Sequence, residues 1–155
     1  MPGTKTLRGL AIAIVFTLGT GSAAMMPTAA NADDDAGKTM TILRIYTGAD
    51  NRSHFEDVEI PLKSAGKIGF LSELIQATGI VFRETGGDYN YDFHTAPRRQ
   101  YVVNLEGEVE IEVGDGSKRI LRSGDILLAE DTTGQGHISR AVAGKPRKSL
   151  FITLD

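Results

Sequence analysis

Side chains that can transfer protons or bind ligands are concentrated in two stretches of the second half of the chain. Residues 86–107 read GGDYNYDFHTAPRRQYVVNLEG, and residues 124–137 read GDILLAEDTTGQGH. The chain has three histidines, and two of them, His94 and His137, lie in these stretches. A carboxylate precedes each, and imidazole and carboxylate are the usual groups of general acid–base catalysis. No nucleophile elbow, phosphate-binding loop or dinucleotide fingerprint accompanies them.

The same two stretches resemble the two motifs of the cupin superfamily, in particular small single-domain cupins with a type-2 barrel. The family's first motif contains H-x-H, then a glutamate, and a glycine after six further residues. His94 stands at the first histidine position, Gln100 at the glutamate position, and Gly107 at the glycine position. The second motif begins with a glycine–aspartate pair, matched by Gly124-Asp125, and ends on a histidine, matched by His137.

The resemblance covers about residues 79–154 and implies an all-β fold, the cupin double-stranded β-helix or jelly-roll barrel. In such barrels the motif histidines and the glutamate point inward and hold one divalent metal ion. Carried over, this implies His94, Gln100 and His137 as ligands. Imidazole with oxygen ligands suits iron, nickel, zinc, manganese or copper without selecting among them.

Two departures from the family pattern bear on that metal. Ala96 stands where the family has its second histidine, and Gln100 supplies a neutral amide in place of a carboxylate. Neutral ligands leave the charge of a dication uncompensated, which weakens binding, leaves coordination positions open and favours an anionic ligand. The alternative is a metal-free pocket in which both histidines and Gln100 hydrogen-bond a ligand or each other.

Four neighbouring residues are further candidates. Arg98 shares strand parity with Gln100, so its guanidinium could pair with a substrate anion at the barrel mouth. Tyr91, in the predicted loop before His94, is a second candidate for substrate binding. Asp92 and Glu130, also placed in loops, are candidates for a general base or for the missing anionic ligand. Each has a structural alternative, in which Arg98 faces solvent and the others shape their loops.

Short runs rich in β-branched residues, separated by glycine-containing turns, predict strands for most of the remaining chain. They are residues 41–47, 57–60, 79–85, 99–105, 108–113, 118–121, 124–129, 136–142 and 149–154. Residues 66–76 have helical spacing of apolar residues, but glycines leave that segment ambiguous. Many short strands at nearly even spacing favour a sandwich, jelly roll or barrel.

Two predicted strands differ in the polarity of the face that lies opposite their core-facing side chains. Glu108, Glu110 and Glu112 alternate with apolar residues and are interpreted as a solvated face opposite a core face. Val103, with Tyr101 and Leu105, instead gives an apolar second face that something must cover. Either N-terminal strands or a partner subunit could cover it, and the sequence predicts a homodimer.

The first 32 residues have the organisation of an export signal. Lys5 and Arg8 precede the apolar run 10–18, and Ala30-Asn31-Ala32 matches the cleavage pattern of signal peptidases. The run is too short to span a bilayer as a helix. We therefore predict a signal peptide at 1–32, a disordered segment at 33–39 and a barrel domain at 40–155. The mature protein is predicted to be exported, periplasmic or secreted, without a stable membrane anchor.

Cleavage removes two of the 17 basic residues and none of the 20 acidic ones, so the formal net charge changes from −3 to −5. An acidic domain without a basic block is a poor partner for nucleic acid. With the resemblance, the sequence predicts a metal-dependent lyase, isomerase or dioxygenase that acts on a small organic molecule such as a carboxylate. The alternative is a non-catalytic module that binds a small ligand or a metal.

Overall fold

The computed structural model describes Gly3 and residues 37–155, and the latter lie within one compact unit. The predicted signal peptide, apart from Gly3, and the predicted cleavage site after Ala32 lie outside the described residues. In the described part of the chain, no helix has the length and apolarity needed to cross a membrane.

The described residues form twelve strands and one short 3-10 helix at Gly66–Ile68. The strands are β1 (Thr39–Thr47), β2 (Ser53–Pro61), β3 (Lys63–Ser64), β4 (Phe70–Leu71), β5 (Gly79–Thr85), β6 (Asn90–His94), β7 (Gln100–Glu106), β8 (Val109–Glu112), β9 (Lys118–Leu121), β10 (Ile126–Glu130), β11 (His137–Ala141) and β12 (Arg147–Thr153).

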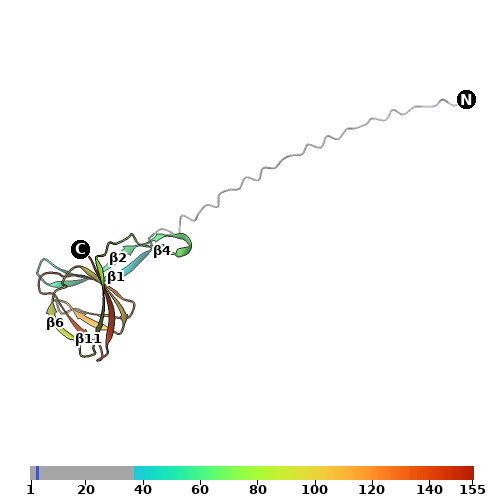
Figure 1. The fold of residues 1–155 in the computed structure, drawn as a ribbon. Helices are drawn as coiled ribbons and strands as arrows, with labels where there is room; N and C mark the ends of the chain where they lie inside the picture. The colour runs from blue at the N-terminus through green and yellow to red at the C-terminus, as the bar shows by residue number, and fades with distance from the viewer. Residues whose placement is uncertain (1–2, 4–36) are drawn as a thin grey trace. The chain divides into compact units, whose positions relative to one another are not determined.

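Two sheets form a jelly-roll barrel, which confirms the predicted all-β fold class (Figure 1). The larger sheet has six strands in the order β2-β1-β10-β7-β12-β5, and the smaller has four in the order β6-β11-β8-β9. From β5 onward the chain passes repeatedly between the two sheets, interrupted by the β8–β9 hairpin within the smaller one. β1 extends the larger sheet by pairing parallel with β10.

Alternating side chains divide the larger sheet into two apolar faces. The inner face belongs to a buried cluster between the sheets, made by Ile45, Ala96, Val102, Val109, Ile111, Val113, Leu121, Leu127 and Ala129. The outer face carries a second cluster of Ile42, Leu128 and Leu154, against which Tyr101 packs. Burial raises the pKa of the Tyr101 hydroxyl.

The predicted solvated face of the strand around Glu110 is confirmed. Val109 and Ile111 are buried, whereas Glu110 and Glu112 form ion pairs with Lys118 and Arg140 on neighbouring strands. Glu110 and Glu112 therefore lie opposite the core face and outside the barrel interior.

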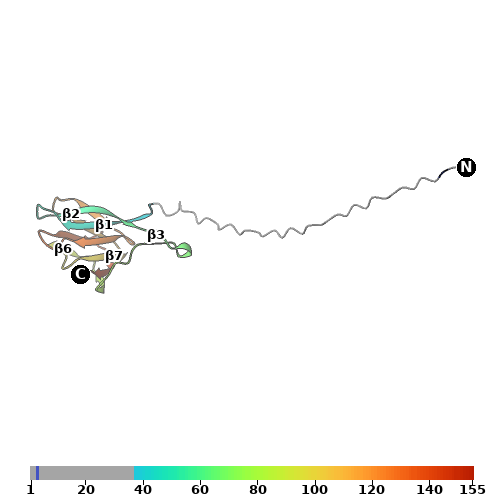
Figure 2. The same cartoon turned by 90° about the horizontal axis from the view of Figure 1, so that it is seen from above.

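The structure resolves one segment that the sequence left ambiguous and corrects another. Residues 66–76 form no α-helix: a single 3-10 turn is followed by β4, and its residues belong to a β3–β4 segment that protrudes from the barrel in both views (Figures 1 and 2). Residues 90–94, predicted as a loop, form strand β6. The strand has only five residues and follows the turn at Gly86-Gly87, so it lacks the length that makes alternation readable.

Candidate functional site

The two motif histidines meet where β6, an edge strand of the smaller sheet, pairs with β11. His94 ends β6, His137 begins β11, and the two residues are partners in the antiparallel register. Their ring centroids lie 4.4 Å apart. Gly136 allows this approach, because its φ is +75° and a Cβ there would overlap the carbonyl oxygen of His94.

One nitrogen of each ring is already committed to a hydrogen bond. His94 Nδ1 lies 2.7 Å from the carbonyl oxygen of Asp92, and His137 Nδ1 lies 2.7 Å from Oδ2 of Asp131. A carbonyl and a carboxylate oxygen accept, so both Nδ1 atoms donate. In a neutral ring, Nε2 then keeps a free lone pair. Both imidazoles can therefore offer Nε2 to a metal ion or to a donor on a ligand.

Asp131 is the residue that fixes His137, and sequence reasoning missed this role. Its side chain is fully buried, and the same Oδ2 also accepts a hydrogen bond from Ser53 Oγ at 2.9 Å. A carboxylate behind an imidazole orients the ring and makes Nε2 a stronger ligand. The sequence shows an aspartate six residues before His137, but only the fold brings the two together.

Gln100 completes the motif residues around one cavity of about 750 Å³ inside the barrel. It begins β7, is 6% exposed, and lines the cavity together with His94 and His137. Ala96 also lines the cavity and, as predicted, contributes no donor. The structure thus gathers the residues that the resemblance placed as ligands.

Tyr91 and Arg98 both line the same cavity. A register shift between His137 and Ser139 lets Tyr91 and His94, three residues apart on β6, lie on the same side of the strand. Their ring centroids are 3.9 Å apart, so the Tyr91 ring packs on the imidazole. Arg98 is exposed and lies in the bend before β7, so the predicted strand parity with Gln100 does not apply to it.

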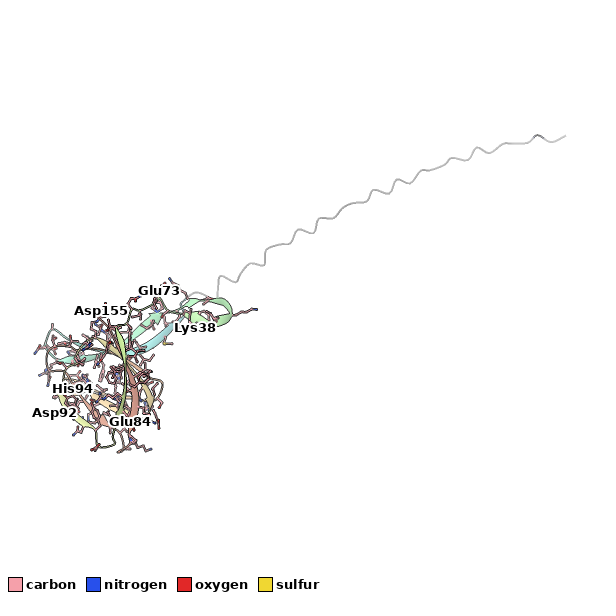
Figure 3. All side chains as sticks on the ribbon, viewed as in Figure 1. Lys38, Glu73, Glu84, Asp92, His94 and Asp155 are labelled. Carbon is pink, nitrogen blue, oxygen red and sulfur yellow. The ribbon has the colours of Figure 1, made fainter. Side chains whose placement is uncertain are left out.

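Glu130 and Asp92 need correction as candidates for a general base or an anionic ligand. Glu130 ends β10 next to Ala129, so its side chain leaves the opposite face of the sheet. There its carboxylate binds Arg44 at 2.6 Å and Arg99 at 2.6 Å. Asp92 acts on His94 through its backbone carbonyl, whereas its carboxylate accepts a hydrogen bond from the Phe93 amide. Figure 3 shows Asp92 and His94 on the same side of the barrel.

Two arginines of the cavity were not predicted. Arg83 comes from β5 and Arg147 from the start of β12, and both line the cavity. Arg147 lies just before the strand predicted at residues 149–154, whereas β12 begins at Arg147. Arg147 shares strand parity with Ser149 and Phe151, which face inward. Parity could therefore have placed Arg147 in the cavity, but only if the strand had been predicted to begin at residue 147.

The surroundings of His94 favour the uncharged form of its imidazole. Burial lowers its pKa below the ordinary 6.5, the hydrogen bond to the Asp92 carbonyl opposes this, and the nearby His137 lowers the pKa further. A neutral ring is the form that binds a metal ion.

The two histidines suit a divalent metal ion, but the ligand set of His94, His137 and Gln100 carries no negative charge. Both rings have the Nδ1–H···O bonds that metal-binding histidines usually have. Gln100 adds one amide oxygen. Within the described residues, no group of three or more histidine, cysteine, aspartate or glutamate side chains is placed to hold a metal ion. Any metal here would therefore have two imidazoles, one amide and open positions.

No protein-family model and no curated protein matches the chain. Among solved structures, it is similar to a conserved protein of unknown function from Streptococcus pyogenes, with 19% identity over 54% of this chain and 69% of that chain and a TM-score of 0.41. A protein from Neisseria meningitidis has 20% identity over 54% of this chain and 81% of that chain, with a TM-score of 0.40.

A third similar structure is dTDP-6-deoxy-D-glucose-3,5-epimerase from Legionella pneumophila, in complex with dTDP-4-keto-L-rhamnose. It has 14% identity over 76% of this chain and 72% of that chain, with a TM-score of 0.37. Similarities this low carry no functional argument, so the function has to be argued from the cavity itself.

Proposed function

We propose that this chain is a metal-dependent enzyme that binds a small organic molecule in its barrel cavity, with one divalent metal ion held by His94, His137 and Gln100. One observation carries the proposal: two imidazoles lie 4.4 Å apart with both Nδ1 atoms committed, which leaves both Nε2 atoms for one ion.

The metal would act as a Lewis acid on a substrate oxygen. The chain's own residues would position the substrate. Tyr91 packs on the His94 ring and borders the cavity, and Arg98 borders it from the bend that precedes β7. Apolar residues of the inner cluster, such as Val102 and Leu127, exclude water from the interior. Lyase, isomerase and dioxygenase chemistry are all compatible with such a site, and the fold does not choose among them.

The test is metal stoichiometry of protein purified without a histidine tag. We expect wild type to retain close to one ion, and His94→Ala and His137→Ala each to lose most of it. His54→Ala is the matched control, because His54 is the third histidine and bonds Asp50 instead. Equal metal content in all four proteins, or none in wild type after incubation with divalent ions, would reject the proposal.

A metal-free binding module is the second candidate, and one observation favours it. The donor set has no charge, while three arginines line the same cavity, so a dication is electrostatically disfavoured until an anion is bound. In that case His94 and His137 would donate or accept hydrogen bonds to the ligand directly. Ligand binding that is unaffected by EDTA would favour this candidate.

Export is also part of the proposal. The support is the basic residues, short apolar run and Ala30-Asn31-Ala32 of the N-terminal segment. An intact mass that begins at Asp33 in exported protein is the expected result. A full-length product in the membrane fraction would contradict it.

We further propose that two copies pair through the outer face of the larger sheet. Three adjacent strands, β7, β12 and β5, place apolar side chains there in register: Tyr101, Val103, Leu105, Ile152, Leu150, Ile80 and Phe82. Phe82 is 81% exposed and Ile80 is 60% exposed. An apolar face of this extent is typical of a protein–protein interface.

A further inference from the structure

The charges around the cavity all have one sign. Its lining contains three arginines, Arg83, Arg98 and Arg147, and no aspartate or glutamate. The carboxylate of Asp131 is fully buried and does not line the cavity, and it is hydrogen-bonded to His137 and Ser53. Positive groups that share a cavity with low-dielectric walls reinforce one another and attract anions.

Arg147 is the residue that makes this arrangement costly without a ligand. It is 5% exposed, and its Nε is buried without a hydrogen-bond partner among the described residues. Burial lowers the pKa of its guanidinium, and the positive charge of Arg83 lowers it further. A buried charge without a partner destabilises a fold, so such a residue is usually retained for what it binds.

Arg83 lies close to Arg147 and is held by aromatic rings. Its guanidinium carbon is 5.1 Å from the ring centroid of Tyr89 and 5.3 Å from that of Phe151. The Tyr89 hydroxyl is in turn hydrogen-bonded to Ser139 Oγ at 2.6 Å. Stacking occupies the faces of a guanidinium and leaves its N–H edge free to donate.

We propose that Arg83 and Arg147 form an anion-binding subsite, which takes a carboxylate or phosphate group of the small molecule bound in the cavity. Arginine suits both groups, because its parallel N–H donors match two oxygens at once. The inference rests on the proposed function only in that the cavity is the ligand site, and it does not require the metal. Arg98, which is exposed, contributes charge at longer range.

The subsite also explains how an uncharged donor set can belong to a metal site. A carboxylate or phosphate held by Arg83 and Arg147 brings negative charge into the cavity that contains His94 and His137. Metal and anion then bind cooperatively, because each offsets the charge that disfavours the other.

The experiment uses purified protein that has been freed of metal with EDTA, so that anion and metal binding are separated. Inorganic phosphate and succinate are titrated while the melting temperature and the heat of binding are recorded. We expect at least one of the two to raise the melting temperature, and the stronger one identifies the anion class. Arg83→Gln and Arg147→Met should each weaken its binding roughly 10- to 100-fold.

Arg147→Met has a second readout that a purely structural arginine would not give. Removing an unpaired buried charge while keeping an apolar side chain should raise the melting temperature of the ligand-free protein. Arg119→Gln is the matched control, because Arg119 is exposed on β9 and outside the cavity lining. It should leave both quantities unchanged.

Three results would overturn the subsite: no stabilisation of wild type by either anion at tens of millimolar, unchanged anion binding in both arginine variants, or a lower melting temperature for ligand-free Arg147→Met. Zinc binding is then measured in the same variants. Retained zinc binding together with any of these results rejects the anion subsite and leaves the proposed metal site standing.

Discussion

His94 and His137 are register partners on strands β6 and β11, with ring centroids 4.4 Å apart and with Nδ1 of each ring already donating a hydrogen bond. The fold fixes both hydrogen-bond acceptors in place. One is a backbone carbonyl of β6 itself, and the other is the fully buried Asp131. The pair therefore presents two Nε2 atoms whose orientation is set before any ligand arrives.

Asp131→Asn tests whether this orientation serves metal binding. The change keeps the size of the side chain and removes the negative charge that strengthens His137 as a ligand. We expect zinc affinity, measured by calorimetry, to fall roughly 10- to 100-fold.

Asp125→Asn is the control for that substitution. Asp125 is an aspartate of the turn before β10 that accepts a hydrogen bond from the Arg122 amide, and the cavity lining does not include it. It should leave zinc affinity unchanged. Equal affinity in Asp131→Asn and wild type would mean that Asp131 supports the fold alone.

Glu130→Gln should lower stability and leave metal binding intact. Burial alone would raise the pKa of Glu130, but hydrogen bonds from Arg99 and Arg44 outweigh it and lower that pKa below its ordinary 4.5. The unfolded chain then binds more protons at low pH, so the contribution is present above about pH 4.5 and is lost as pH falls through the lower folded pKa.

We expect the variant to lose about 1 kcal/mol at pH 7 and to show a flatter decline of its melting temperature between pH 5 and 3 than wild type. The measurement is thermal unfolding across that pH range. A variant that unfolds like wild type but loses bound metal would return Glu130 to the candidate site residues.

The dimer proposal is tested by Phe82→Asp, which places a charge in the middle of the exposed stripe on β5. Multi-angle light scattering should give twice the protomer mass for wild type and a monomer for the variant. Phe93→Asp is the control, since Phe93 is also exposed, at 41%, but belongs to the smaller sheet. A wild type that is monomeric at tens of micromolar would contradict the interface.

Much of the barrel could be predicted because its strands alternate in burial. On β8, the buried Val109 and Ile111 alternate with half-buried glutamates, and on β7 the buried Gln100 and Val102 alternate with half-buried apolar residues. The positions of His94, Gln100 and His137 in one cavity followed from the resemblance of their motifs. Local patterns of this kind need no knowledge of distant contacts.

The rest of the site depended on contacts between distant segments. Arg83 and Arg147 come from β5 and β12, whose pairing no local pattern reveals. Glu130 was interpreted as a loop residue near the site because it precedes His137. Its actual role follows from the pairing of β10 with β1, which brings Arg44 to the opposite face. Strand parity across a sheet, rather than nearness in sequence, decides which side chains enter the cavity.

The most direct test of the metal site is the substitution Gln100→Glu, which adds one negative charge beside the two histidines without changing side-chain size. With a dication in place, the carboxylate offsets its charge and the ion binds more tightly. Without one, only the cavity arginines can offset the charge of a carboxylate in this buried position, and added divalent ions should not raise the melting temperature. Glu130→Gln is the reverse exchange outside the cavity; because it is expected to melt lower but to keep its metal, it serves as the control for metal stoichiometry only.

The measurement is thermal unfolding and metal stoichiometry of wild type and Gln100→Glu, each with and without added divalent ions. The metal site predicts that Gln100→Glu binds one ion more tightly than wild type and gains the larger increase in melting temperature when the ion is added. A Gln100→Glu protein that melts below wild type, and whose melting temperature no ion raises, would contradict it.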